Sequence, residues 1–309
     1  MTSQYNSSTL PVWRYDSNSN QWKSYDPSRS QDTQPKDISS FRVVTYNIWF
    51  DQSHQPFRFQ SLSVILNNSN SHVICLQEMT YPILQQLISQ SWVQQRYMIS
   101  DVDASTFSNG KQGYGVVMLI QKDLCLRQLL IVEFPTRMGR SLLFTQLKFG
   151  TETILVGTVH LESLNSREAR SQQLKICKSI FETYTADDQH TTCLLMGDFN
   201  FDANGSENVE HMTLLSNWLD VWPTVKGPNN LGWTFDTSTN TMLKNHPKTT
   251  SRLDRIMIAS SVRKPAQIEI IGNKCVEQMQ LETATMNNRT TSLSNIFPSD
   301  HYGLMADFN

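Results

Sequence analysis

Six short stretches of the sequence place amide, carboxylate or imidazole side chains beside one end of an apolar, strand-like run. In "LLMGDFN" the run stops at Gly197 and is followed at once by Asp198 and Asn200. The other five stretches carry Asn47 in "TYNIW", Glu78 in "ICLQE", His160 in "GTVHLES", Asp254 in "SRLDRIMI", and Asp300 with His301 in "FPSDHYGL". One such residue is commonly a turn cap or a satisfied core histidine. Six stretches in one chain predict a cleft where strand ends meet.

This set of side chains suits metal-assisted cleavage of a phosphate ester. Glu78 and Asp300 offer the hard oxygen ligands that Mg²⁺ prefers, and such an ion neutralises charge on phosphoryl oxygens. A carboxylate at Asp198 can orient and deprotonate an in-line water. Zinc hydrolysis is the competing interpretation, but the sequence has no HExxH motif and no cysteine cluster.

The remaining polar residues are predicted to donate hydrogen bonds without adding negative charge. Asn47, Asn200 and His160 would donate to the equatorial phosphoryl oxygens. Asp254 would hold a neighbouring imidazole, most naturally His301, in its charged and correctly turned form.

The elements that must position these residues follow from the pattern of apolar residues. Strands are predicted at "FRVVTYNI", "HVICLQE", "YGVVMLI", "LCLRQLLIVEF", "SLLFTQLKF", "TILVGTVHLES", "TTCLLMGDFN", "RLDRIMIA", "AQIEII" and "YGLMADF". Helical spacing appears in "FRFQSLSVILNN", "YPILQQLISQ" and "REARSQQLKICKSIFETY". Strands of this length interspersed with amphipathic helices favour two packed sheets covered by helices on the outside.

The first forty residues differ in composition from the rest. Residues 1–40 are rich in Ser, Asn, Gln, Asp and Pro, with Trp13 and Trp22 as the large anchors. We expect a polar, largely flexible N-terminal segment. The alternative for "VWRYDSNSNQWKSYDP" is a small hairpin docked on the domain. Residues 41–309 are then the catalytic domain.

Composition limits the class of protein. No apolar run approaches the roughly 20 residues of a membrane helix, and the start of the chain lacks the features of a secretory signal. The five cysteines form no zinc or CxxC pattern, and we interpret them as reduced core residues. The formal net charge of −2 gives no whole-protein case for nucleic-acid binding, and the basic residues near 121–150 and 167–178 are most simply a solvated face.

In this order, the stretches "TYNIWF", "LQE", "VHLES", "GDFN", "RLDRI" and "SDHYGL" resemble the endonuclease/exonuclease/phosphatase superfamily of magnesium-dependent phosphodiesterases. The resemblance covers residues 41–309 and implies an α/β fold, a four-layer sandwich of two packed mixed β-sheets flanked by helices. It also implies the shared catalytic and metal-binding set: Asn47, Glu78, Asp198, Asn200, Asp300 and His301, with Asp254 supporting the terminal histidine.

Within that superfamily, "TVHLESLNSREARSQQL" and "GWTFDTSTNTMLKN" are most similar to the type 2 tyrosyl-DNA phosphodiesterases, which detach a tyrosine from a DNA 5′ end and leave a 5′ phosphate. This resemblance implies a role for His160 at the phosphate, with Ser163 near it and with Thr234 and Phe235 at the substrate. The ring of Phe235 would stack on a base, and core packing is its alternative. Independently of the resemblance, Arg252 is predicted to bind substrate, and Arg167, Arg170 or Arg140 are predicted to contact phosphate. Two positions depart from the family pattern. Trp49 stands where the family has an acidic residue, and Asp202 stands where it has an arginine, which is expected to weaken DNA binding.

The expected activity is hydrolysis of 5′-phosphotyrosyl bonds at DNA ends with Mg²⁺, or Mn²⁺ in its place. The expected partner is nucleic acid with a 5′ protein adduct at a single-stranded end, met by a monomer with no membrane attachment in the nucleus or cytoplasm. Two alternatives stay open. One is another hydrolase of the same chemistry, such as an abasic-site endonuclease, an inositol or sugar phosphatase, or a sphingomyelinase-like enzyme. The other is a non-catalytic binding relative, against which the intact site residues argue.

Overall fold

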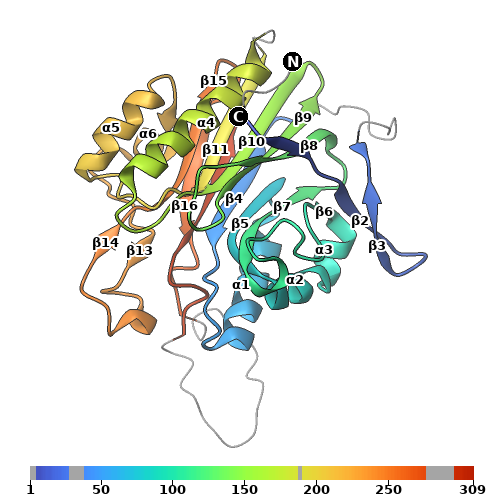
Figure 1. The fold of residues 1–309 in the computed structure, drawn as a ribbon, viewed down its shortest axis with the longest axis horizontal. Coiled ribbons are helices and arrows are strands. Elements are labelled where there is room, and N and C mark those ends of the chain that lie inside the picture. Colours follow the sequence, from blue (N-terminus) through green and yellow to red (C-terminus); the bar gives the residue numbers. More distant parts are fainter. Residues whose placement is uncertain (1–4, 28–37, 187–189, 276–295) are drawn as a thin grey trace, which may run out of the picture.

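Two β-sheets pack face to face, and helices cover their outer faces (Figure 1). The computed structural model describes residues 5–27, 38–186, 190–275 and 296–309. In this part of the chain the predicted four-layer α/β sandwich is confirmed. None of the described helices is long and apolar enough to cross a membrane.

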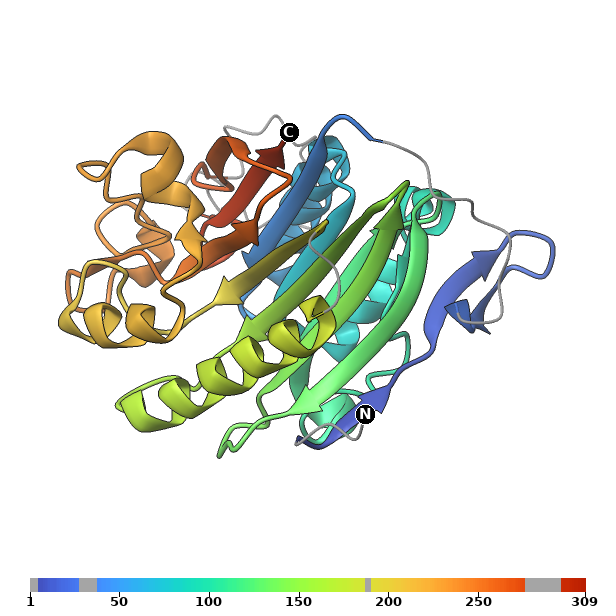
Figure 2. The same ribbon diagram turned by 90° about the horizontal axis from the view of Figure 1, so that it is seen from above.

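The first sheet has seven strands, and its outer face carries the longest helix, α4 (Arg167–Thr185). In spatial order the strands are β1 (Ser7–Thr9), β8 (Cys125–Glu133), β9 (Ser141–Phe149), β10 (Glu152–His160), β11 (Thr191–Asp198), β15 (Asp254–Ser260) and β12 (Leu219–Asp220). Figure 2 shows α4 along this sheet, on the side away from the helices of the other sheet. Strands β10 and β11 are parallel, so the polar residues that end both strands lie at the same edge.

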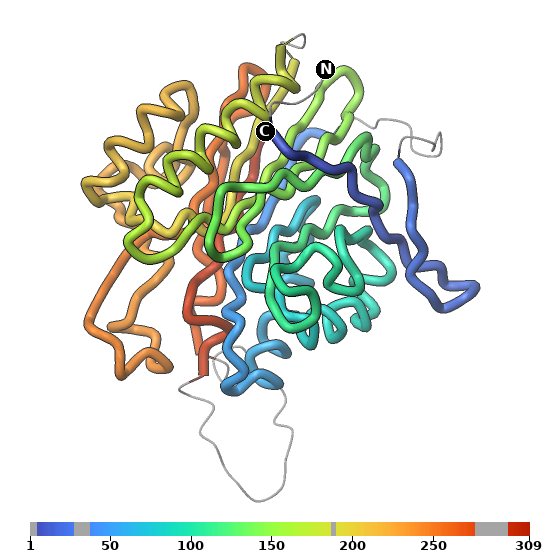
Figure 3. Tube along the Cα trace, in the orientation of Figure 1, coloured from blue at the N-terminus to red at the C-terminus, as the bar shows by residue number. Residues whose placement is uncertain are grey.

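The second sheet has eight strands. Their spatial order is β16 (Pro265–Ile271), β17 (Gly303–Phe308), β4 (Phe41–Asn47), β5 (Val73–Thr80), β7 (Tyr114–Gln121), β6 (Tyr97–Ile99), β2 (Val12–Asp16) and β3 (Gln21–Tyr25). Figure 3 shows β4 beside β17, which comes from the end of the chain. The helices near this sheet are α1 (Gln55–Ser69), α2 (Tyr81–Ile88) and α3 (Ser91–Arg96).

The remaining described elements connect the sheets. They are α5 (Ser206–Leu214), α6 (Val221–Lys226), the short hairpin of β13 (Phe235–Asp236) and β14 (Thr250–Ser251), and the 3₁₀ turns Gly110–Gln112 and Thr241–Leu243. The hairpin meets the second sheet through an isolated bridge from Phe235 to His301. This bridge brings the end of the chain to the middle of the site described below.

Apolar side chains from both sheets form the central core, as the continuous apolar runs predicted. All ten predicted strands and all three predicted helices are present. The five cysteines are free and buried, which confirms their interpretation as reduced core residues.

The N-terminal residues need a correction. Strand β1 pairs with β8 in the first sheet, and β2 pairs with β6 in the second, with β3 completing a hairpin. The indole Nε1 of Trp22 also donates to the carbonyl of Ile88 (3.3 Å). The described residues 5–27 are therefore built into the domain, as the hairpin alternative allowed, and the domain begins before residue 41. Residues 1–4 and 28–37 of the expected flexible segment lie outside the described residues.

Candidate active site

His160, Asp198 and Asp254 lie side by side across three neighbouring strands of the first sheet. His160 ends β10, Asp198 ends β11 and Asp254 begins β15, and the strand register pairs His160 with Asp198 and Asp198 with Asp254. All three are almost fully buried. The Nε2 atom of His160 lies 3.5 Å from Oδ2 of Asp198. The register of the sheet therefore brings together three of the residues that sequence motifs had singled out.

Asn47 joins this row to the second sheet. Its side-chain Nδ2 donates to Oδ2 of Asp198 (3.0 Å) and to Oε1 of Glu78 (3.2 Å). Below this contact, Gln77 donates to Thr45 and to Thr158 on the opposite sheet. The two sheets are thus tied by polar contacts where the site begins.

Glu78 occupies an irregular point of its strand. The register of β5 against β7 shifts between Leu76 and Met79, and Glu78 itself has φ = 59°. A left-handed conformation at a non-glycine residue costs of order 1–3 kcal/mol and persists only where the surroundings impose it. Here the backbone N–H of Phe50 donates to Oε2 of Glu78 (2.9 Å). The bulge directs this carboxylate into the site.

Arg140 sets the tautomer of His160. Its Nη1 lies 2.7 Å from Nδ1 of His160, and since a guanidinium only donates, Nδ1 must accept and the ring proton sits on Nε2. Burial and the charge of Arg140 lower the pKa of His160 to about 3. His160 is therefore a neutral hydrogen-bond donor that faces Asp198 and Glu78.

His301 has the opposite character. Its Nδ1 lies 2.8 Å from Oδ2 of Asp254. Burial disfavours the charged ring, but the carboxylates of Asp254, Asp300 and Asp198 outweigh it and raise the pKa of His301 well above 6.5. Two neighbouring imidazoles thus differ in charge because one faces a guanidinium and the other faces carboxylates.

The carboxyl groups of the site also differ in the direction of their pKa shifts. Burial and the charge of Asp300 raise the pKa of Glu78 to about 7, and burial raises the pKa of Asp300. Burial also raises the pKa of Asp254 to about 6, and its Oδ1 is buried without a hydrogen-bond partner. Burial acts against Asp198 as well, yet His301 and His160 keep its pKa below 3.8.

Two groups of residues could bind a metal ion. One ligand atom each of Asp198, Asp254 and His301 lie within 4.8 Å of one another. In that group the charged His301 already compensates the carboxylates, and a protonated imidazole is not a ligand. Glu78 and Asp300 offer oxygen donors, and the pKa values of both carboxyl groups are raised because they are buried without enough positive charge nearby. A hard divalent ion fits these two carboxylates better than the histidine group.

Buried contacts hold the loops that carry these residues. The hydroxyl of Ser299 lies 2.7 Å from the Asn47 carbonyl oxygen and 3.1 Å from Oδ1 of Asp300. The guanidinium of Arg58 donates to five backbone carbonyls: Ile48, Trp49, Asp51, Ser53 and Pro298. It also lies 4.6 Å from the centroid of the Trp49 ring. Trp49, one of the two departures from the family pattern, therefore packs on the residue that fixes both loops.

Four predicted residues adjoin the site or support it. Asn200, with φ = 55°, donates its backbone N–H to Oδ1 of Asp198 (2.8 Å) and its side chain to the Leu161 carbonyl (2.9 Å). The ring of Phe235 lies 5.2 Å from the ring of His301. Thr234 is fully buried, and its Oγ1 accepts the backbone N–H groups of Leu253 and Asp254, so it supports the site and does not face a substrate. Ser163 is half-buried, with its hydroxyl against the sulfur of Met138.

The predicted basic substrate contacts are mostly engaged elsewhere. Arg252 is buried, and its Nη1 donates to Oδ2 of Asp220 (2.6 Å). Arg170 is buried against Glu207 through Nε (2.6 Å) and Nη2 (2.8 Å). The prediction that Arg252 and Arg170 contact the substrate was therefore wrong, since both form buried ion pairs with carboxylates. The sequence did not reveal these pairs because the partners lie far away in the chain. The half-exposed Arg167 pairs with Glu210 on α5.

Arg140 and Tyr114 have positions in the site that the sequence did not predict. Arg140 was expected as one of three interchangeable phosphate contacts, but its buried position against His160, 5.4 Å from the ring of Tyr114, was not predicted. Tyr114 opens β7, and the exposed ring of Phe50 stacks on it at 5.0 Å. The only signal for Arg140 in the sequence was its place in a basic segment, and Tyr114 had none.

Comparison with known proteins assigns the family. The model of the "Endonuclease/Exonuclease/phosphatase family" matches residues 44–301, which span every predicted catalytic and metal-binding residue. The chain belongs to this family. The relatives to which it is similar include tyrosyl-DNA phosphodiesterase 2 of Gallus gallus, 28% identical over 279 residues, which cover 88% of this chain and 67% of the relative. The Homo sapiens protein of the same name is 26% identical over 290 residues, 91% of this chain and 72% of the relative.

Solved structures of the family share the fold. A D. rerio tyrosyl-DNA phosphodiesterase 2 complexed with a single-stranded DNA product superposes with a TM-score of 0.71 and 22% identity, over 88% of this chain and all of that one. A truncated Caenorhabditis elegans counterpart gives a TM-score of 0.70 and 21% identity, over 87% and 98% of the two chains. Family membership and the site together make this protein a phosphodiesterase.

Proposed function

We propose that the protein is a Mg²⁺-dependent 5′-tyrosyl-DNA phosphodiesterase that acts in DNA repair. The observation that carries the proposal is the contact of Asn47 with both Glu78 and Asp198, which joins a metal-type carboxylate to a catalytic one across the two sheets. The names of the relatives supply the substrate class. The neighbouring structure with a single-stranded DNA product agrees with a nucleic-acid substrate.

Glu78 and Asp300 are the proposed holders of the metal ion. A bound Mg²⁺ supplies positive charge to the phosphoryl oxygens and relieves the repulsion between the two buried carboxylates. Mn²⁺ meets the same oxygen donors and is expected to substitute.

Asp198 is the proposed general base. Its lowered pKa keeps it ionised at neutral pH, and its Oδ1 is fixed by the N–H of Asn200. In the proposed step the water oxygen attacks phosphorus, a water proton passes to Asp198, and the bond from phosphorus to the tyrosyl oxygen breaks. The tyrosyl oxygen leaves with the bonding electron pair, which a phenol with an ordinary pKa near 10 tolerates well.

Positive and neutral donors around Asp198 have separate tasks. His160 offers its Nε2 proton to a phosphoryl oxygen without changing charge, while the imidazolium of His301, held by Asp254, stabilises negative charge. Asn200 keeps one side-chain N–H for the substrate. Asn47 donates to Glu78 and Asp198, so we assign it to positioning in place of the predicted phosphate contact.

Arg140 adds a cation to the phosphate side of the site. It is buried, its Nε has no hydrogen-bond partner, and no carboxylate pairs with it among the described residues. Glu162 lies within reach of its charge but forms no ion pair with it, and an anionic substrate would compensate the buried guanidinium more fully. We therefore propose Arg140 as a phosphate-binding residue, with Tyr114 beneath its guanidinium.

A second candidate function rests on Asp202. This carboxylate stands at the arginine position of the family pattern, and its Oδ1 accepts the backbone N–H of Arg252 (3.2 Å). A negative side chain there disfavours a nucleic-acid backbone. The observation favours a hydrolase of the same chemistry with a smaller substrate, such as a sugar phosphatase or an inositol phosphatase.

The proposed setting is intracellular, in the nucleus or cytoplasm, where a monomer meets a single-stranded DNA 5′ end that carries a protein adduct. A substrate panel tests the function. It comprises a 5′-tyrosyl oligonucleotide, an abasic duplex, inositol phosphates, sugar phosphates and sphingomyelin, each with Mg²⁺ and with chelator. We expect the highest kcat/KM for the 5′-tyrosyl oligonucleotide. Preference for any other member of the panel would refute the proposal in favour of that substrate class.

A further inference from the structure

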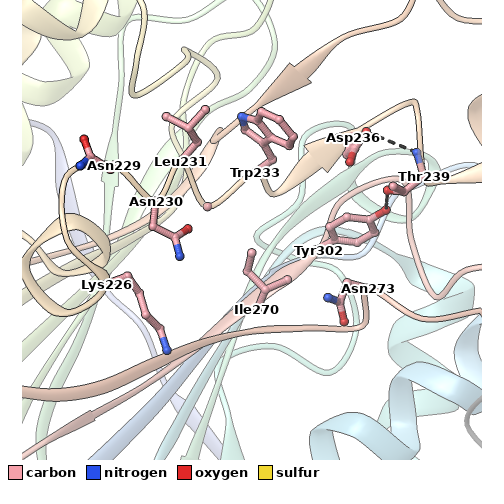
Figure 4. A pocket seen from close by; sticks show the side chains of 11 residues that line it. Lys226, Asn229, Asn230, Leu231, Trp233, Asp236, Thr239, Ile270, Asn273 and Tyr302 are labelled. Carbon is pink, nitrogen blue, oxygen red and sulfur yellow. Dashed lines mark hydrogen bonds between the residues drawn. The ribbon is translucent and has the colours of Figure 1, made fainter.

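A pocket of about 740 Å³ lies next to the active site but outside it. It is bounded by the loop between α6 and β13, by β16 and by Tyr302. Figure 4 shows the ring of Trp233 and the side chain of Ile270 on opposite sides of this pocket, with Tyr302 at one end and Lys226 at the other. We call it the outer pocket. None of the catalytic or metal-binding residues discussed above lines it.

The outer pocket and the active site share one wall. Phe235 and His301 form a backbone bridge, and their rings lie together on the active-site side. The next residues along both segments, Asp236 and Tyr302, line the outer pocket. Successive side chains on extended backbone point to opposite faces, so the two sites lie back to back across the bridge. A polymeric substrate bound at the active site needs to extend only past this wall to reach the pocket.

The walls of the pocket combine aromatic and hydrogen-bonding groups. Trp233 is 38% exposed and Leu231 is 42% exposed, so two large apolar side chains of one loop face solvent at the pocket. Asn229, Asn230 and Asn273 contribute amides. Such a combination suits a planar base, which stacks by its face and forms hydrogen bonds by its edge.

The charges of the pocket suit an anion. Lys226 forms no ion pair within the part of the chain that the structure describes, and Figure 4 shows its side chain extending along the pocket. Among the described residues that line the pocket, Asp236 is the one carboxylate, and it is turned into its own loop, where it accepts the N–H and hydroxyl of Ser238 (2.8 and 2.5 Å). A ligand with both a planar ring and a phosphate matches these groups.

The loop that carries Trp233 is held in place. The indole Nε1 of Trp222 donates to the carbonyl of Asn230 (2.9 Å). Gly232 has φ = 61°, and a Cβ there would lie 2.2 Å from the Trp222 ring, so the loop packs closely on that indole. A fixed loop presents Trp233 at a low entropic cost of binding.

We propose that the outer pocket binds one nucleotide of the substrate DNA strand, with its base stacked on Trp233 and its phosphate near Lys226. The inference rests on the proposed function and extends it, because it makes the enzyme sensitive to the length of the DNA. The pocket binds nucleic acid at a distance from the scissile bond, through residues that take no part in the chemistry.

The test compares 5′-tyrosyl oligonucleotides of two and ten nucleotides with wild type, Trp233→Ala and Trp233→Phe. We expect Trp233→Ala to raise KM for the longer substrate by roughly tenfold and to leave the dinucleotide unchanged, because one stacked base is lost. Trp233→Phe should restore most of the loss, and Lys226→Gln should weaken the salt dependence of KM for the longer substrate. Val262→Ala, which alters an apolar side chain of similar exposure outside the pocket, is the matched control.

Single abasic sites in the longer substrate identify the stacked nucleotide. At one position the abasic substitution and Trp233→Ala should not add, since both remove the same contact. Equal effects of Trp233→Ala on both lengths, or additivity at every position, would overturn the inference. A second substrate series carries peptides of increasing length on the tyrosine. If the effect of Trp233→Ala on KM grows with the length of the peptide and not with that of the DNA, the inference is overturned in favour of a peptide ligand. If wild type cleaves neither oligonucleotide, the proposed function fails first. In that case, fluorescence titration of wild type and Trp233→Ala with the unmodified ten-mer tests separately whether the outer pocket binds DNA. Equal affinities of the two proteins would reject DNA binding at the pocket.

Discussion

Two clusters of buried charged side chains in this protein have opposite balances of charge. In the arginine cluster, Asp220 accepts from Arg252 and from Arg255 through the same oxygen, each at 2.6 Å. The two guanidinium groups overcome burial and lower the pKa of Asp220. In the site cluster, four carboxylates face one charged imidazole, and the pKa values of Glu78 and Asp254 are raised to about 7 and about 6.

The difference separates stability from function. In the arginine cluster both guanidinium groups donate to the same carboxylate, and these hydrogen bonds fix the loop before β15. The site cluster leaves Oδ1 of Asp254 without a partner and holds Glu78 at a positive φ. Strain and missing charge of this kind collect at functional sites, where a substrate or a metal ion completes the balance.

The largest effect on stability is expected from the arginine cluster. Asp220→Asn removes the countercharge of two buried guanidinium groups and should lower the free energy of unfolding by about 3 kcal/mol, measured by urea denaturation. Turnover of the folded protein should stay near wild type. The matched control is Glu210→Gln, which breaks the half-exposed pair with Arg167 and should barely change stability. A stable but inactive Asp220→Asn would break the comparison, because the arginine cluster would then be functional.

The reverse result is expected in the site cluster. Asp198→Asn keeps the shape of the side chain and removes the base, so kcat should fall at least about 10²-fold with substrate binding retained. A modest fall in melting temperature is expected, because His301 and His160 stabilise the charged form of Asp198 and lower its pKa. Turnover near the wild-type rate would remove Asp198 from its proposed role.

Phe235 sharpens the comparison at the border of the site cluster. Phe235→Ala should raise KM for a 5′-tyrosyl oligonucleotide roughly tenfold if its ring stacks on a base. A small chromogenic phosphotyrosyl ester, which has no base, should be hydrolysed almost as before. An equal loss on both substrates would instead mean that the ring only positions His301, which it contacts.

The smallest effect concerns a histidine outside both clusters. The Nδ1 atom of His72 accepts the backbone N–H of Arg42 (2.9 Å), and burial lowers the pKa of His72 below 6.5. The unfolded chain therefore binds the proton more tightly, so stability is complete above about pH 6.5 and falls as the pH drops towards the lower folded pKa. Melting temperatures at pH 7.5 and 5.5 should differ more for wild type than for His72→Asn, whose amide oxygen can still accept. Equal differences would show that His72 does not contribute.

The sequence predicted the strands and the residues at their ends well, because both depend on local signals. Continuous apolar runs mark buried strands, and polar residues at their ends are visible in the chain itself. The contacts among Asn47, Glu78 and Asp198 follow once the strands are aligned. The N-terminal strands were harder to predict, since short polar segments enter a sheet only when another strand offers its edge.

The basic residues show where prediction from sequence ended. Arg252 and Arg170 were expected at the substrate. They are instead buried in ion pairs, Arg252 with Asp220 and Arg170 with Glu207, whose partners lie more than thirty positions apart in the chain. Arg140 gave the same signal in the sequence and yet lies beside His160. Only the three-dimensional arrangement distinguishes a guanidinium with a carboxylate partner from one without. The positive φ of Glu78 was equally hidden, because its strand reads as regular.

The metal dependence of 5′-tyrosyl cleavage in wild type and Glu78→Gln tests the central claim most directly. The account predicts that wild type releases tyrosine and a 5′-phosphorylated oligonucleotide in Mg²⁺, and that chelator abolishes this activity. Glu78→Gln should fold with an unchanged or higher melting temperature and should show little turnover at Mg²⁺ concentrations that saturate wild type. Cleavage that persists in chelator, or normal turnover of Glu78→Gln with a clear drop in melting temperature, would contradict the account.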